Sequence, residues 1–250
     1  MDWLRMTANA KLFDHYSFRA RLQPALLALL PAALAVFAWT GPGARWVSAL
    51  WTLFDTAGGT FFLANVARNR GRELEPRLWD SWAGTPTTQL LRHSGPANPV
   101  LLERWHKHLS RLLGKKFPTR QEEATDSVAA DHLYRAGTKL LIDRTRDVKA
   151  YPLLYKENVN YGFCRNLYGL KSTGIIMSVL GIVGSGAAWF WKSGISQMAP
   201  LVCATASAAF LIWWLTTVKP SWVKQPAFAY AERLLESSEK LFKTTSARAK

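Results

Sequence analysis

Three stretches of the chain are apolar and free of charged residues over a length that can cross a membrane. They comprise residues 22–40, 173–191 and 199–218. Each has about the 20 residues that a helix needs to span a hydrocarbon core of roughly 30 Å. A backbone in lipid must satisfy its own hydrogen bonds, so each stretch is predicted to be a helix. The chain is therefore expected to be an integral membrane protein.

A fourth stretch, 46–66, is less apolar because it carries Asp55 near its centre. The turn signal Gly-Pro-Gly at 41–43 joins it to the first stretch, and a short polar break joins the last two. Each pair is therefore predicted to form an antiparallel hairpin. We expect an all-α integral membrane protein with two transmembrane helical hairpins, that is, four spans, and a helical cytosolic domain between them.

Lysine and arginine are concentrated outside the apolar stretches, chiefly in the long segment between the hairpins. Positively charged loops stay on the cytoplasmic side, so both termini and this segment are expected in the cytoplasm. A cleaved signal peptide is disfavoured, because the charged region before the first stretch is long and another hydrophobic stretch follows at once. The predicted segments are a cytosolic N-terminus (1–21), a first hairpin (22–66), a basic cytosolic domain (67–172), a second hairpin (173–218) and a cytosolic tail (219–250). The tail is expected to restart after Pro226 as an amphipathic helix, on the membrane or against a partner chain.

Local signals divide the segment 67–172 into helices. Asn98, followed by a proline, is typical of a helix start, and Gly114 is a natural stop. Thr119 and Glu122 have the spacing of a capping box that opens another helix. No strand-like alternation of comparable length occurs, so this domain is predicted to be helical.

The composition argues against a catalytic or metal site. The chain carries a net charge of +15 and has only two cysteines, Cys164 and Cys203, so no disulfide framework is indicated. His106 and His108 point in different directions on a helix and flank a lysine, which makes them a poor metal pair. No glycine-rich phosphate loop and no Ser-His-Asp pattern occurs. We expect no enzymatic activity, no metal and no cofactor.

The basic residues of the middle segment are the main candidates for ligand binding. Arg104, Lys107 and Arg111 recur at helical spacing and are predicted to line one helical face. Such a face suits the phosphates of a nucleic acid or nucleotide, with nearby aromatic residues for base stacking. It equally suits anionic headgroups, or it is simply the excess of positive charge found in cytoplasmic segments. The candidate ligand-binding residues are Arg92, His93, Arg104, Lys107, Arg111, Lys115, Lys116 and Arg165.

An acidic residue at membrane depth is costly unless it faces a partner or water, so Asp55 is a candidate pore residue. The small residues beside it allow neighbouring helices to approach closely. Two other interpretations remain: a carboxyl group that is protonated or hydrogen-bonded within the bundle, and a shallow helix that does not reach the midplane. The candidate pore or gate residues are Asp55, Thr56, Gly58, Gly59 and Thr60.

Three segments carry a resemblance to known proteins: PTTQLLRH at 86–93, ENVNYGF at 157–163 and RNLYGLK at 165–171. With the layout of hairpin, helical domain and hairpin, they resemble the membrane effectors of Hailong-type anti-phage defence systems. The last two segments lead directly into the third predicted span, so they either transmit movement or anchor the helix at the headgroups.

The resemblance implies a homotetramer in a bacterial inner membrane, without a catalytic site. The tetramer would be silenced by an oligodeoxyadenylate that a partner nucleotidyltransferase makes. Loss of the oligomer would then open a membrane pore. The expected function is a channel-forming effector gated by a nucleotide or a short single-stranded DNA oligomer. The alternative is a membrane-anchored scaffold whose basic domain binds anionic lipid or a partner protein. An enzyme acting on lipid phosphates is least favoured, because no acid–base or metal constellation is evident.

Overall fold

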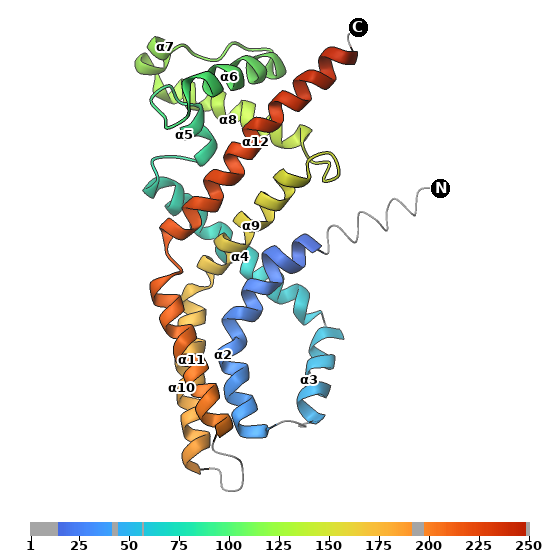
Figure 1. Cartoon of the computed structure of the whole chain (residues 1–250), viewed down its shortest axis with the longest axis vertical. Coiled ribbons are helices and arrows are strands. Elements are labelled where there is room, and N and C mark those ends of the chain that lie inside the picture. The colour runs from blue at the N-terminus through green and yellow to red at the C-terminus, as the bar shows by residue number, and fades with distance from the viewer. Residues whose placement is uncertain (1–14, 42–44, 57, 192–197, 249–250) are drawn as a thin grey trace, which may run out of the picture. The chain divides into compact units, whose positions relative to one another are not determined.

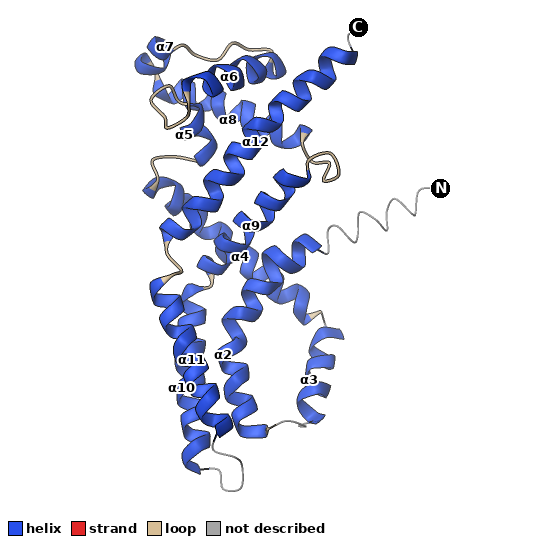
Figure 2. Cartoon of the chain, in the orientation of Figure 1, coloured by secondary structure: helices blue, strands red, loops and turns tan. Residues whose placement is uncertain are grey.

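The computed structural model describes residues 15–41, 45–56, 58–191 and 198–248, and these residues form helices and connecting loops without any strand (Figure 2). The fold class predicted from the sequence is therefore confirmed as all-helical. The elements are η1 (Ser17–Leu22, a π-helix), α2 (Gln23–Thr40), α3 (Arg45–Thr56), α4 (Gly59–Ser81), α5 (Pro86–Leu91), α6 (Pro99–Leu113), α7 (Arg120–Thr125), α8 (Ser127–Arg144), α9 (Pro152–Gly169), α10 (Lys171–Trp191), α11 (Met198–Thr216) and α12 (Pro220–Arg248).

The chain forms two compact units. The first comprises Met1–Glu75 and Gly162–Val223, and the second comprises Pro76–Tyr161 and Lys224–Lys250. The helices α4, α9 and α12 each contribute residues to both units.

The first unit contains three helices that are long and apolar enough to span a membrane. They are Ser17–Thr40, which joins η1 to α2, and the helices α10 and α11. Large apolar side chains such as Val183 and Phe190 are exposed along them, as expected for surfaces that face lipid tails. These features identify a membrane protein.

Small residues let the three apolar helices pack closely. The helices α10 and α11 lie side by side, and α2 packs against both (Figure 1). A Cβ atom on Gly181 of α10 would lie 2.6 Å from Ser207 Oγ on α11 and 2.7 Å from the carbonyl oxygen of Pro31 on α2. Such close approach is the usual way in which helices associate in lipid, where burial of apolar surface gives little driving force.

The predicted span 46–66 is not one helix in the structure. Its first part is α3, and α4 begins at Gly59 after Gly58 adopts a left-handed conformation with a φ of 80°. The helix α3 has 12 residues, which corresponds to about 18 Å and is shorter than a hydrocarbon core. The described residues therefore contain three helices of spanning length rather than the four that we predicted.

The second unit is built around a core shared by α5, α6, α8 and α12. Its largest fully buried side chains include Trp105, Tyr134, Leu234 and Leu235. Since Leu234 and Leu235 belong to α12, apolar residues of the predicted amphipathic helix pack into this core. The helix also begins earlier than predicted, because α12 starts at Pro220 and contains Pro226 within it.

The helix boundaries of the second unit follow from local capping. The Asn98 side chain accepts a hydrogen bond from the Val100 N–H at the start of α6, and Gly114 ends that helix in a left-handed conformation. Thr119 and Glu122 form the predicted capping box at the start of α7. Because such caps satisfy backbone groups that the helix cannot, they fix where α6 ends and α7 begins.

Candidate functional site

A hollow of about 610 Å³ in the second unit brings four cationic side chains together. Its lining residues are Glu103, His106, Lys107, Ser110, Arg111, Gly114, Lys115, Lys116 and Phe117. Positions spaced three and four apart on α6 supply one wall. The left-handed conformation of Gly114 turns the chain so that the two lysines that follow supply another. We call this feature the α6 hollow.

The loop that carries these lysines is fixed to the helix. The backbone N–H of Phe117 donates a hydrogen bond of 2.9 Å to Ser110 Oγ on α6, and the Phe117 side chain is buried in the core. Lys107, Lys115 and Lys116 have no ion pair among the described residues, whereas Glu103 is the one carboxylate that lines the hollow. The hollow is thus a preformed cationic surface suited to an anion such as phosphate.

Arg104 does not join the α6 hollow, although its spacing predicted a shared face. Its guanidinium pairs with Glu239 of α12 at 3.3 Å. His108 also faces α12, where its ring stacks on Phe242 at 4.6 Å between centroids, and Arg111 lies over the same ring at 4.6 Å. The packing of α12 thus divides the predicted face, and Arg111 lies where the two parts meet.

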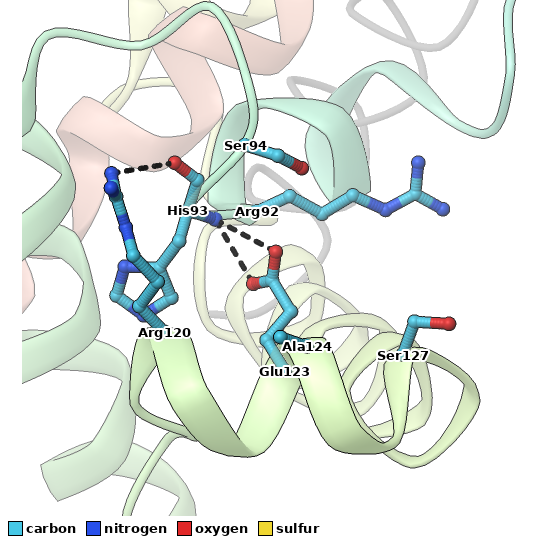
Figure 3. Close-up of a pocket in the computed structure, with 7 residues that line it drawn as sticks. All are labelled: Arg92, His93, Ser94, Arg120, Glu123, Ala124 and Ser127. Carbon is cyan, nitrogen blue, oxygen red and sulfur yellow. Dashed lines mark hydrogen bonds between the residues drawn. The ribbon is translucent and has the colours of Figure 1, made fainter.

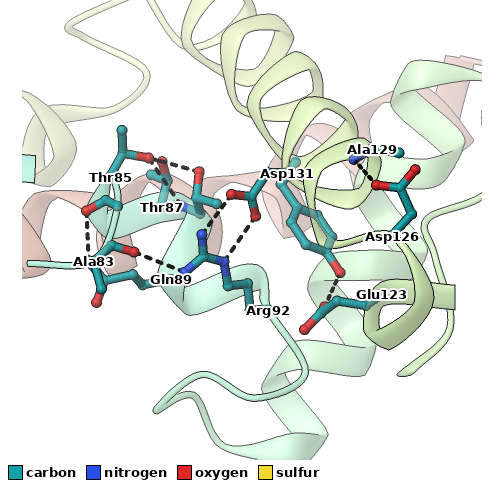
Figure 4. Close-up of polar contacts among 12 residues, drawn as sticks. Ala83, Thr85, Thr87, Gln89, Arg92, Glu123, Asp126, Ala129 and Asp131 are labelled. Carbon is teal, nitrogen blue, oxygen red and sulfur yellow. Dashed lines mark hydrogen bonds and ion pairs between the residues drawn. The ribbon is translucent and has the colours of Figure 1, made fainter. Parts of the chain in front are cut away.

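Arg92 serves the interior of the second unit (Figure 4). Its Nε and Nη2 atoms donate to the two carboxylate oxygens of Asp131 at 2.9 and 2.6 Å, and Nη1 donates to the Ala83 carbonyl oxygen at 2.9 Å. The hydrogen bonds to Asp131 raise the pKa of Arg92 above its ordinary value. This bidentate ion pair joins the end of α5 to α8. The guanidinium of Arg92 therefore already has a carboxylate partner and is less available to a ligand.

A buried carboxylate holds the backbone next to Arg92. Glu123 accepts hydrogen bonds of 2.9 and 3.1 Å from the His93 N–H and one of 2.6 Å from the Tyr134 hydroxyl. Burial, followed by the hydrogen bond to Glu123, raises the pKa of Tyr134 well above its usual value, so the hydroxyl remains protonated and donates. Arg120 donates to the His93 carbonyl oxygen at 3.4 Å.

A second cavity, of about 560 Å³, opens beside this carboxylate (Figure 3). It is lined by Arg92, His93, Ser94, Arg120, Glu123, Ala124 and Ser127. In Figure 3 the carboxylate of Glu123 points to the backbone of His93. The side chain of Arg92 extends away from His93. Because the cavity combines a carboxylate with cations that already have partners, it suits an anion less well than the α6 hollow does.

The ring of His106 takes part in the packing of the second unit. His106 Nε2 lies 2.7 Å from the Leu91 carbonyl oxygen, which requires a proton on that nitrogen. Burial lowers the pKa of His106 below its ordinary value, so the neutral ring is favoured. Within the described residues, no group of three His, Cys, Asp or Glu side chains is arranged to hold a metal ion.

Arg165 belongs to the first unit, where it is part of another set of contacts. Its Nη1 atom donates to Glu75 at 2.7 Å and its Nε atom donates to Asn166 Oδ1 at 3.1 Å. Asn166 is fully buried, and its amide donates to the Ala20 carbonyl oxygen at 2.6 Å. No local pattern in the sequence distinguishes Asn166, because a buried amide is recognisable only from its partners.

The candidate pore residues lie at the break between α3 and α4. The exposed Asp55 accepts a hydrogen bond of 2.9 Å from the Thr60 hydroxyl, across the left-handed Gly58. Gly59 packs against the ring of Phe54 so closely that a Cβ atom would overlap it, and Thr56 is the last residue of α3. The carboxylate thus lies near the N-terminus of α4, where the helix dipole favours negative charge.

No family model, no curated protein and no solved structure matches this chain. The fold and these sites therefore define a class only: an all-helical membrane protein with a basic second unit.

Proposed function

We propose that this protein is an oligomeric channel-forming membrane effector of bacterial anti-phage defence. In this proposal a nucleotide or a short single-stranded DNA oligomer, made by a partner nucleotidyltransferase, binds the second unit and gates the channel. The observation that supports a phosphate-bearing ligand is the α6 hollow. Its preformed surface is lined by four cationic side chains and only one carboxylate. Phosphates are the ligands that such a surface recognises best.

The proposed channel is shared between subunits. Three spanning helices, with the break region of α3 and α4 as a fourth membrane segment, leave no room for a pore within one chain. Symmetry-related copies, four in our proposal, would surround a common axis. The protein would lie in the bacterial inner membrane with both termini in the cytoplasm.

Asp55 and its small neighbours are the proposed pore or gate residues. The supporting observations are the exposure of Asp55 and its hydrogen bond to Thr60, which place a carboxylate at a helix break rather than in a packed core. The stretch 155–171 contains the end of α9 and the start of α10, so it is the proposed link between ligand binding and the membrane helices.

A membrane-anchored scaffold whose basic cytosolic domain binds anionic lipid or a partner protein is the second candidate. It is favoured by basic residues of this domain that lie close to the apolar helices in the chain, such as Arg165, which precedes α10. An enzyme acting on lipid phosphates is the third candidate, and no metal-binding cluster among the described residues supports it.

The test uses the purified full chain in liposomes and measures potassium flux with and without a short oligodeoxyadenylate. Under the channel proposal, flux depends on the oligomer. Asp55→Ala changes the flux but leaves oligomer binding intact, while the exposed Asp143→Ala serves as its control. Lys115→Gln with Lys116→Gln shifts the response to higher oligomer concentration and preserves the flux of the unliganded protein.

Native mass spectrometry of the same preparation counts the subunits. A closed oligomer with flux supports the proposal. A monomer, or liposomes no more permeable than protein-free ones under either condition, would refute it and favour the scaffold.

A further inference from the structure

Four arginines gather in the first unit from three different helices. Arg21 lies on η1, Arg68 and Arg72 lie one turn apart on α4, and Arg165 lies on α9. Asn166, next to Arg165, donates a hydrogen bond to the carbonyl oxygen of Ala20, next to Arg21. A Cβ atom on Gly71, next to Arg72, would lie 2.3 Å from Asn166 Oδ1, so the arginines extend from one crossing of the three helices. We call these residues the arginine cluster.

Two arginines of the cluster have no charge partner among the described residues. Arg165 pairs with Glu75 at 2.7 Å, and both side chains are largely buried, with 12% and 15% exposed. Arg68 and Arg72 have neither an ion pair nor a side-chain hydrogen bond among the described residues, and Arg72 is exposed. Arg68 and Arg72 therefore keep their charge without a carboxylate partner in the described part of the chain, and a bound anion would stabilise them.

Tight contacts hold the three helices of the cluster in place. The backbones of α4 and α9 cross at Gly71 and Gly169, where a Cβ atom on Gly169 would lie 2.6 Å from the Gly71 nitrogen. Asn166 joins α9 to η1 through its hydrogen bond to the Ala20 carbonyl oxygen. Because these contacts fix the helices relative to one another, the arginines are preorganised rather than gathered by chance.

The cluster lies at the ends of two apolar helices. Arg21 is near the start of the candidate span Ser17–Thr40, and Arg165 precedes α10, which begins at Lys171. Arg21 also lies over the ring of Tyr16, 5.3 Å from its centroid. Arginine with tyrosine at the end of a span is typical of the depth at which lipid headgroups lie.

We propose that the arginine cluster binds the phosphate of an anionic phospholipid headgroup on the cytoplasmic side of the membrane. Guanidinium groups match the geometry of phosphate oxygens, and basic pockets between membrane helices are a known means of retaining anionic lipids. The proposal rests on the placement of the apolar helices in a bilayer and is independent of the gating ligand and the pore.

The test titrates the full chain in detergent with phosphatidylglycerol or phosphatidylcholine and follows bound lipid by native mass spectrometry. Arg68→Gln with Arg72→Gln is expected to weaken the apparent affinity for phosphatidylglycerol by about 30-fold, from the usual contribution of two basic residues. Binding of phosphatidylcholine should be unchanged. Arg70→Gln with Arg77→Gln removes the same charge from α4 outside the cluster and should leave phosphatidylglycerol binding within about threefold of the wild type.

Arg68→Lys with Arg72→Lys keeps the charge and is the control for misfolding of the glutamine variant. It should retain most of the affinity for phosphatidylglycerol. The proposal fails if the glutamine variant binds phosphatidylglycerol like the wild type, or if the control pair weakens it equally. It also fails if inorganic phosphate displaces the lipid at equal concentration, which would indicate a site for free phosphate. Loss of oligodeoxyadenylate binding with intact lipid binding would assign the cluster to nucleic acid instead.

Discussion

The salt dependence of oligonucleotide binding provides the sharpest test of the α6 hollow. Each cation that contacts a phosphate of a single strand releases condensed counterions and contributes about −0.7 to the slope of log K against log salt concentration. Four cations line the hollow: Lys107, Arg111, Lys115 and Lys116. If each contacts one phosphate, the slope is about −2.8, and a fourfold rise in salt weakens binding by about 50-fold.

Removing two of these cations should halve the slope. In Lys115→Gln with Lys116→Gln we expect about −1.4, so the same rise in salt weakens binding by only about sevenfold. The control, Lys139→Gln with Lys149→Gln, removes the same charge from two exposed lysines of the second unit outside the hollow. Its slope should stay near that of the wild type.

The assay is fluorescence anisotropy of a labelled oligodeoxyadenylate of about six nucleotides, with the purified full chain at several salt concentrations. A slope unchanged by the hollow variant would refute the assignment of these lysines to phosphate contacts. Equal reductions in both variants would show that only the total charge of the protein matters, as an unspecific excess of cytoplasmic charge predicts.

Three further predictions concern stability. Tyr134→Phe leaves the buried Glu123 with one hydrogen-bond donor fewer and should lower the free energy of unfolding by about 2 kcal/mol. Amide hydrogen exchange in α7 and α8 should then become about 30-fold faster, whereas the control Tyr168→Phe should leave the exchange rate unchanged. Gly181→Ala forces α10 away from its two neighbours and should lower the melting temperature in detergent, whereas Gly186→Ala, with open space around its Cβ position, should not. Burial lowers the pKa of His106 in the folded state below the unfolded value of about 6.5, so the unfolded state binds more protons as the pH falls through that value. The second unit should therefore lose stability between about pH 7.5 and pH 5.5, and His106→Gln should reduce that loss, as urea unfolding at each pH would show.

The sequence predicted those elements whose signals are local. Apolar stretches without charges predicted α2, α10 and α11, because length and hydropathy alone decide whether a helix can span a membrane. Asn98, Gly114 and Thr119 predicted the ends of α6 and the start of α7, because caps act within a few residues. The adjacent glycines Gly58 and Gly59 were interpreted as close packing within a span, although Gly58 instead ends a helix through its left-handed conformation.

The candidate site was only partly predictable for a different reason. The spacing of Lys107 and Arg111 placed them together, but spacing could not show which part of the α6 surface α12 covers. That covering assigns Arg104 to Glu239, which lies 135 positions away in the chain. The same holds for Arg92 and Asp131, which lie 39 positions apart. Long-range partners decide whether a basic residue is available to a ligand.

The distribution of acidic partners separates two kinds of basic residue in this protein. Asp131 and Glu75 pair with Arg92 and Arg165 where side chains are largely buried, because a buried guanidinium without a partner is strongly destabilising. A chain with 32 basic and 17 acidic residues that places carboxylates at such positions leaves other cations unpaired elsewhere. Some of these cations, such as Lys139 and Lys149, lie at scattered exposed positions, as a plain excess of cytoplasmic charge predicts. Others collect at two places, the α6 hollow and the arginine cluster, and this clustering is what favours bound phosphate there over unspecific charge.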